Sequence, residues 1–117
     1  MPESVLIVLN DAPYGTEKTY NGLRLSIALQ ARSNKVSVFL MADAVFCGVP
    51  QQETPPGYYN IHEMLERVLA KGGRVAACGS CMKARGLRVE GLIKGVEQGS
   101  MALLSEWTEK CGKIHSF

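Results

Sequence analysis

Two cysteines three positions apart, Cys78 and Cys81, are the residues of this sequence with the clearest chemical potential. They enclose Gly79 and Ser80 and follow directly on an apolar, strand-like run at residues 75–77. If that run is a strand and Ser80 caps a short helix, Cys78 lies where strand becomes helix. Because an open α/β sheet presents its chemistry at that position, the two sulfurs are candidate functional groups.

Three kinds of chemistry are open to this Cys-x-x-Cys. A structural zinc site needs two further ligands, usually as a second close pair. The other candidate ligands are instead scattered singly: Cys47, His62, Cys111 and His115. A thioredoxin-like dithiol begins a helix, but here the pair follows the third predicted strand, and no later strand opens with the proline that the thioredoxin fold uses. The third possibility is a single reactive thiol that carries sulfur as a persulfide.

Burial is the alternative to chemistry for each of these thiols, since free cysteine often packs as a small hydrophobic residue. We expect Cys47 and Cys111 to be buried in this way. For Cys81, burial and reactivity both stay open. Cys78 is the best candidate nucleophile, because free helix N–H groups and the nearby cationic side chains of Lys83 and Arg85 would stabilise its thiolate. Those cations could equally form a solvated helix face.

Three further residues are candidates for the same site. Tyr14 and Gly15 fall in the loop after the first predicted strand, at the same sheet edge as Cys78 if the strands are parallel. They either line a shared pocket or form a simple turn with a packed ring. Asp43, near the start of a possible helical turn at residues 42–48, either reaches that pocket or caps the turn. Neither histidine has an evident partner that would make it a catalytic base.

Composition and charge exclude several classes of function. The chain has 117 residues, of which 46% are hydrophobic and 21% charged, which predicts one folded domain over residues 1–117. A net charge of +2 with no basic block predicts no nucleic-acid partner. The apolar runs are too short to cross a bilayer, and the N-terminus carries no basic leader. We therefore expect a cytoplasmic protein with reduced cysteines and no membrane partner.

The first half of the chain reads as a βαβ unit. Residues 4–9 are a continuous apolar and β-branched run, typical of a central strand buried on both faces. Thr16 is a suitable cap for a helix that continues with apolar residues at helical spacing and ends at residues 33–34. Residues 35–41 form a second strand. This arrangement predicts parallel strands joined by a crossover helix.

The second half adds three strands. A proline-rich loop at residues 49–59 precedes a helix capped by Asn60, and residues 74–77 form the third strand. A short helix at residues 89–93 and a short strand at 96–97 follow. Ser100 caps a last helix, and the strand 113–117 closes the chain, with Ile114 and Phe117 expected as its apolar anchors. The prediction is a three-layer α/β/α sandwich with a mostly parallel, five-stranded sheet in a flavodoxin-like layout. No glycine-rich phosphate motif follows the first strand, so a flavin or nucleotide cofactor is not expected, and no other cofactor is predicted. No metal is expected either, because the candidate ligands are scattered.

Four segments in order and register carry a family resemblance: APYGTE at residues 12–17, FLMADAV at 39–45, CGSCMKARG at 78–86, and the ending 107–117. They resemble the DsrE/DsrF-like family, most closely its small, stand-alone YchN-like branch. The resemblance implies a DsrEFH-like sandwich in which the first strand lies centrally, beside the second and the last. It also implies trimers or hexamers.

The family's best-understood members are sulfur carriers that hold a persulfide on one cysteine. That cysteine stands eight residues before a glycine, with arginine just ahead of the glycine. Cys78, Arg85 and Gly86 match this pattern, so the resemblance places the role on Cys78. The sequence departs from it at residues 79–81, where the carriers have small apolar residues. The carriers also work with sister subunits, which one chain does not reveal.

The resulting prediction is a sulfur-relay protein, sulfurtransferase-like if it is an enzyme, that accepts and passes on sulfane sulfur at Cys78. Gly79, Ser80 and Arg85 would help to hold the persulfide. Its partners would be sulfur donor and acceptor proteins and further copies of itself. Two alternatives stay open: a Cys78/Cys81 dithiol–disulfide redox protein, and a non-enzymatic oligomer that binds a small ligand or partner.

Overall fold

A computed structural model describes residues 3–117. Its centre is a five-stranded sheet in the order β4-β3-β2-β1-β5, and every adjacent pair of strands is parallel. The strands are β1 (Ser4–Leu9), β2 (Lys35–Leu40), β3 (Arg74–Cys78), β4 (Val96–Gly99) and β5 (Lys113–Ser116). The predicted parallel sheet is confirmed, with β1 between β2 and β5 as the resemblance implied. The middle strand, however, is β2.

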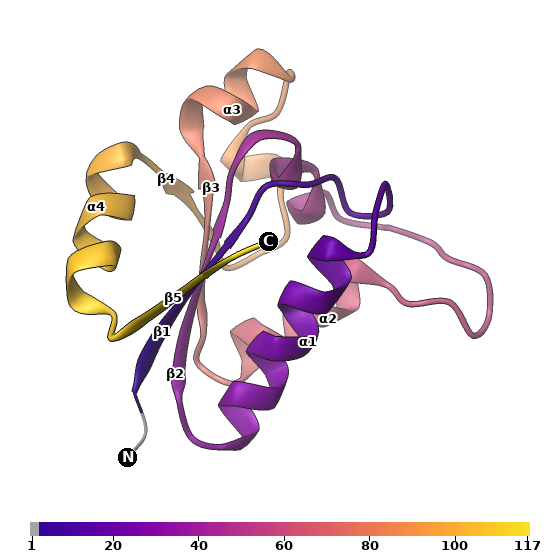
Figure 1. Ribbon diagram of the computed structural model, residues 1–117. Helices are drawn as coiled ribbons and strands as arrows, with labels where there is room; N and C mark the ends of the chain where they lie inside the picture. Colours follow the sequence, from indigo (N-terminus) through magenta and orange to yellow (C-terminus); the bar gives the residue numbers. More distant parts are fainter. Residues whose placement is uncertain (1–2) are drawn as a thin grey trace.

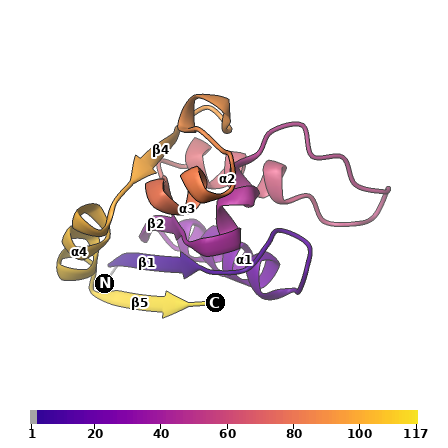
Figure 2. The same ribbon diagram turned by 90° about the horizontal axis from the view of Figure 1, so that it is seen from above.

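Helices cover both faces of the sheet, so the predicted three-layer sandwich is also confirmed. Figure 1 shows α1 (Lys18–Ala31) and α2 (Ile61–Ala70) together on one face and α4 (Met101–Lys110) alone on the other. The short α3 (Gly79–Ala84) lies beyond the end of β3. Two 3₁₀ helices complete the chain: η1 (Ala42–Gly48) and η2 (Val89–Gly91). Helix α3 contacts η1, and the view from above shows α3 lying over the sheet (Figure 2).

The two faces of the sheet bury two separate apolar clusters. Under α4, Leu6 packs with Phe39 and Trp107, whose rings meet edge to face at 5.9 Å. The larger cluster lies under α1 and α2 and includes Ile7 and Val38. Because successive residues of a strand point to opposite faces, β1 and β2 supply both clusters and are mostly apolar. This explains the unbroken apolar runs of the sequence.

Several element boundaries differ from the prediction. Helix α1 begins at Lys18 after Glu17, and the Thr16 hydroxyl accepts a hydrogen bond from the Lys18 N–H at 3.2 Å. The first residue of α3 is Gly79, so Cys78 rather than Ser80 occupies the N-cap position. Ile114 is not an anchor of the last strand, because 47% of its surface is exposed. It lies on an edge strand with no covering helix.

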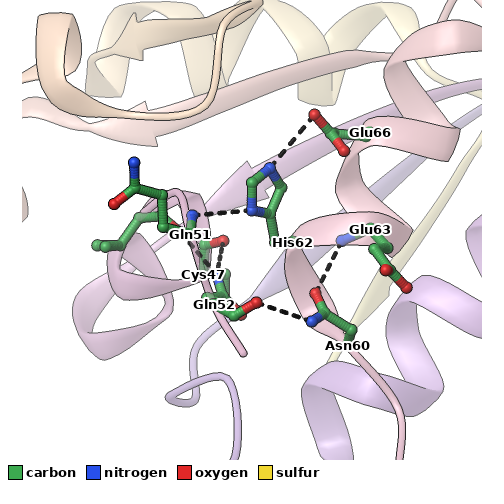
Figure 3. A network of polar contacts seen from close by, with 8 residues as sticks. Cys47, Gln51, Gln52, Asn60, His62, Glu63 and Glu66 are labelled. Carbon is green, nitrogen blue, oxygen red and sulfur yellow. Dashed lines mark hydrogen bonds and ion pairs between the residues drawn. The ribbon is translucent and has the colours of Figure 1, made fainter. Parts of the chain in front are cut away.

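Two helix caps were predicted correctly. The Asn60 carboxamide accepts the Glu63 N–H at 3.0 Å at the start of α2 (Figure 3), and the Ser100 hydroxyl accepts the Leu103 N–H at 3.1 Å at the start of α4. Asn60 also donates to the Gln52 carbonyl at 2.9 Å, which ties the loop before α2 to the helix. Within residues 3–117, no helix is both long and apolar enough to cross a membrane.

Candidate functional site

Cys78 is the residue at which β3 becomes α3. It is the N-cap of α3, and its sulfur accepts a hydrogen bond from the Cys81 N–H at 3.4 Å. The Ser80 hydroxyl lies 3.5 Å from the same sulfur. Unsatisfied N–H groups at a helix start stabilise an anionic acceptor, so this geometry favours a thiolate. Cys78 is only partly buried and is therefore open to a reactant.

Cys81 is held by a different part of the chain. Its sulfur accepts a hydrogen bond from the backbone N–H of Ala42, at 3.3 Å, from the first residue of η1. Ala42 has a φ of +50°, a conformation that non-glycine residues seldom adopt. Sequence reasoning missed Ala42, since an alanine 39 residues away carries no side-chain signal for this contact.

The surroundings move the pKa values of the two thiols in opposite directions. Partial burial acts to raise the pKa of Cys78, but the hydrogen bonds from Cys81 and Ser80 outweigh it, so its pKa is lowered. Burial raises the pKa of Cys81, and the hydrogen bond between the two thiols raises it further. Cys78 is therefore the more acidic thiol of the pair.

Arg85 and Asp43 form an ion pair next to the cysteines, and neither side chain forms a hydrogen bond with a cysteine sulfur within residues 3–117. The Arg85 Nε donates to the Asp43 carboxylate at 2.8 Å, and another guanidinium nitrogen donates to the Cys81 carbonyl at 3.1 Å. The pair thus joins the end of α3 to the start of η1. Gly86 follows with a φ of +73°, which explains why glycine suits this helix end.

Gly79 allows α3 to approach β4 closely. A Cβ at this position would lie 3.2 Å from the Gly99 carbonyl oxygen, tighter than ordinary van der Waals contact. Ser80 is exposed, with its hydroxyl beside Cys78. A cavity of about 590 Å³ lies beside α3, and its lining includes Gly79, Lys83 and Gln98. The sulfurs of Cys78 and Cys81 do not line it.

Tyr14 contacts α2 and the loop before it. Its hydroxyl accepts the Ile61 N–H at 3.1 Å and donates to the Gln52 carboxamide. Burial raises its pKa. Gly15 is exposed, and only the Ala12 Cβ would come near a side chain there, at 3.8 Å. Among residues 3–117 no hydrogen bond joins Tyr14 or Gly15 to Cys78, so the contacts place both outside the cysteine cluster.

The other two cysteines have the surroundings expected of packed thiols. Cys47 is fully buried, and burial raises its pKa to about 12. Cys111 is partly buried, and burial raises its pKa too. Across the described residues, no three side chains of His, Cys, Asp or Glu gather in a way that could hold a metal ion.

His62 has a structural contact on each ring nitrogen (Figure 3). Its Nδ1 accepts the Gln51 N–H at 3.0 Å, and its Nε2 lies 3.2 Å from a Glu66 carboxylate oxygen. Gln51 has a φ of +64°, so the histidine holds a strained turn of the loop against α2. Both ring nitrogens of His62 therefore have partners within the chain.

The fold and the site define a parallel α/β protein with a thiol of lowered pKa at the carboxyl edge of its sheet. A second thiol, Cys81, lies beside it.

Comparison with known proteins assigns the family. The chain belongs to the DsrE/DsrF-like family, whose model matches residues 3–117. It is 40% identical to protein YchN of Escherichia coli over 117 residues, which cover 98% of this chain and 99% of that protein. An uncharacterized protein of Methanopyrus kandleri is 37% identical over 113 residues, covering 97% and 93% of the two chains.

Solved structures agree with this assignment. The crystal structure of YchN from E. coli superposes with a TM-score of 0.90 at 39% identity and covers 100% of both chains. A protein of unknown function from Methanobacterium thermoautotrophicum matches with a TM-score of 0.75 at 17% identity, over 97% of both chains. The second likeness concerns the fold alone. The family resemblance of the sequence is therefore confirmed.

Proposed function

We propose that this protein is a sulfur-relay protein that accepts and passes on sulfane sulfur as a persulfide on Cys78. The observation that carries the proposal is the position of Cys78 at the N-cap of α3, where its sulfur accepts the Cys81 N–H at 3.4 Å and lies 3.5 Å from the Ser80 hydroxyl. In line with this geometry the pKa of Cys78 is lowered, whereas the pKa values of Cys47, Cys81 and Cys111 are raised. Membership of the DsrE/DsrF-like family is consistent with this role.

The chemistry is thiolate exchange. The Cys78 thiolate attacks the outer sulfur of a donor persulfide, R–S–SH, and the S–S bond of the donor breaks. The products are Cys78–S–SH and the donor thiolate. After loss of its proton, the terminal sulfur is an anion that the Ser80 hydroxyl and nearby backbone N–H groups can stabilise. An acceptor thiolate then attacks that terminal sulfur, takes it, and restores the Cys78 thiolate.

A dithiol reaction is the second candidate, and the contact between the two thiols favours it. Cys81, once deprotonated, attacks the inner sulfur of the Cys78 persulfide. A Cys78–Cys81 disulfide forms and hydrosulfide leaves, so the persulfide is reduced by two electrons that the dithiol supplies. Regeneration then needs an external thiol reductant.

One experiment separates the two. Reduced protein is mixed with glutathione persulfide, and intact mass and released sulfide are followed with time. The carrier predicts a gain of one sulfur atom that Cys78→Ser abolishes and Cys81→Ser keeps, with Cys111→Ser as the matched control. The dithiol reaction predicts sulfide release that needs both cysteines. If no variant shows an adduct or sulfide, both functions are wrong.

We further propose that the protein acts in the cytoplasm with donor and acceptor proteins, as a trimer or hexamer of identical chains. An exposed edge supports the assembly: β5 pairs only with β1, all four of its residues are exposed, and Ile114 lies on it. Such edges are normally covered. Light scattering after size-exclusion chromatography tests this, and a monomer at micromolar concentration would contradict it.

A further inference from the structure

A second candidate site lies away from the cysteines, in a groove of about 750 Å³ between α1 and α2. Tyr20, Arg24 and Ala28 line it from α1, and Arg67 lines it from α2. These helices cover the face of the sheet opposite α4 (Figure 1). None of the lining residues contacts Cys78 or Cys81 through a hydrogen bond within residues 3–117. The volume lies in the range of about 300–1,000 Å³ that is typical of small-molecule sites.

One wall of the groove is a stack of tyrosine rings. Tyr20 and Tyr59 lie 4.1 Å apart between ring centroids with an angle of 16°, and Tyr58 continues the stack at 4.5 Å and 20° from Tyr59. Tyr14 packs behind Tyr59 at 5.8 Å. All four tyrosines of the chain are thus gathered here. Tyr58 is 49% exposed, so the stack presents an open aromatic surface.

The groove also carries uncompensated positive charge. Arg24 and Arg67 line it with a single acidic residue, Glu63, and neither arginine forms an ion pair within the described chain. The Arg24 guanidinium lies 5.4 Å from the centroid of the Tyr20 ring and donates to the Asn21 carboxamide at 3.1 Å. These two contacts hold the Arg24 guanidinium at the Tyr20 end of the aromatic stack.

We propose that this groove binds a small planar aromatic molecule that carries an anionic group. The ring would extend the tyrosine stack at Tyr58, and the anion would face Arg67 on α2, since Arg24 lies beside Tyr20 at the other end of the stack. Because the tyrosines are already stacked on one another, little side-chain freedom is lost when a further ring is added. Stacking on an aromatic side chain tolerates different ring types, so the structure assigns a ligand class. This binding function is separate from the sulfur chemistry and does not depend on it.

The loop before α2 supports a preformed site. Tyr58 and Tyr59 lie on this loop, which the Tyr14 hydroxyl and the Asn60 carboxamide tie to neighbouring backbone. His62 holds the start of the same loop through Gln51 (Figure 3). These contacts fix both ends of the segment that carries the rings. A ligand therefore meets an ordered aromatic wall.

Three probes test the two halves of the proposal. Adenosine 5′-monophosphate supplies ring and anion, adenosine supplies the ring alone, and ribose 5-phosphate supplies the anion alone. Each is titrated into the full-length ¹⁵N-labelled protein while amide chemical shifts are followed. We expect saturable binding of adenosine 5′-monophosphate, at least fivefold weaker binding of each of the other probes, and shifts confined to residues 20–31 and 58–67.

Two variants then test the named contacts. Tyr58→Leu and Arg67→Gln should each weaken binding of adenosine 5′-monophosphate at least fivefold. Lys94→Gln is the matched control, because it removes the same charge from an exposed residue outside the groove and should leave the affinity unchanged. Both target side chains are exposed, so the folded state should persist, which circular dichroism checks.

Several results would overturn the proposal. Equal affinity for ribose 5-phosphate would show that the groove attracts anions without using the rings. Shifts at residues 78–86 in place of the groove would move the site to the cysteines. Absence of saturable binding, together with dissociation of an oligomer by Tyr58→Leu, would show that the groove is an interface between copies.

Discussion

The hydrogen bond between the two thiols leads to the sharpest prediction about the site. Replacing Cys81 with alanine removes the side-chain hydrogen bond that helps to lower the pKa of Cys78, but it keeps the backbone N–H that Cys78 accepts at 3.4 Å. A neutral hydrogen bond contributes about 1 kcal/mol, which is about fivefold in the equilibrium between thiol and thiolate. The thiolate fraction of Cys78 near neutral pH should fall by this factor.

The alkylation rate should fall by less than the thiolate fraction. A more basic thiolate is a better nucleophile, with a Brønsted coefficient of about 0.4–0.5. The higher reactivity of the remaining thiolate therefore offsets about half of the loss in thiolate fraction, on a logarithmic scale. We therefore expect iodoacetamide to modify Cys78 about two- to threefold more slowly in Cys81→Ala than in the parent protein. The rate is read at the level of the Cys78 peptide by mass spectrometry.

The pH profile fixes the sign of the effect. Because the pKa of Cys78 is lowered, its thiolate persists to lower pH than an ordinary thiol, and its alkylation rate falls only as the pH drops through that lowered pKa. In Cys81→Ala the fall should begin at higher pH. Cys81→Ser keeps a donor and should resemble the parent protein. Cys47, with a pKa raised to about 12 by burial, should stay unmodified and report on unfolding.

Two outcomes would refute this reasoning. If Cys81→Ala alkylates as fast as the parent at every pH, the thiol of Cys81 does not stabilise the Cys78 thiolate. If Cys81→Ser slows the reaction as much as alanine does, the change comes from altered packing and not from the lost donor.

Two predictions concern stability, each measured by urea unfolding. Asp43→Ala should lower the free energy of unfolding by about 0.5–1 kcal/mol, because it removes a partly exposed partner of Arg85, and no change would mean that the ion pair is fully screened. Gly99→Ala should cost about 1–3 kcal/mol, since its Cβ would lie 2.8 Å from the Phe39 ring. The control is Gly91→Ala, which meets nothing within 4 Å, and an equal loss there would contradict the packing argument.

The fold was predictable because its main signals are local. The apolar runs at β1 and β2 mark strands buried on both faces, and Asn60 and Ser100 mark helix starts through side chains that accept backbone N–H groups. The start of α3 was harder, because a cysteine sulfur occupies the capping position there. Cysteine is not a usual cap, so Ser80 appeared to be the better candidate.

Part of the geometry around the cysteines follows from a rule that the sequence can use. Parallel strands bring their carboxyl ends to one edge, and Asp43 and Arg85 form their ion pair at that edge. The same rule does not decide the direction in which a loop leaves that edge. After β1, the loop carries Tyr14 away from the cysteines to the start of α2, where its hydroxyl meets a free backbone N–H. Such a tertiary contact has no periodicity that the sequence reveals.

The Cys78 and Cys81 sulfurs accept hydrogen bonds from backbone N–H groups in different parts of the chain, and their environments differ for this reason. The Cys78 sulfur accepts the Cys81 N–H within its own helix turn, so any chain that folds into this strand–helix junction provides that contact. The Cys81 sulfur instead depends on Ala42, whose position requires a left-handed backbone at the start of η1. The Asp43–Arg85 pair holds η1 against α3 next to that residue. Since burial still raises the pKa of Cys81, this second contact stabilises the position of its thiol more than its ionisation.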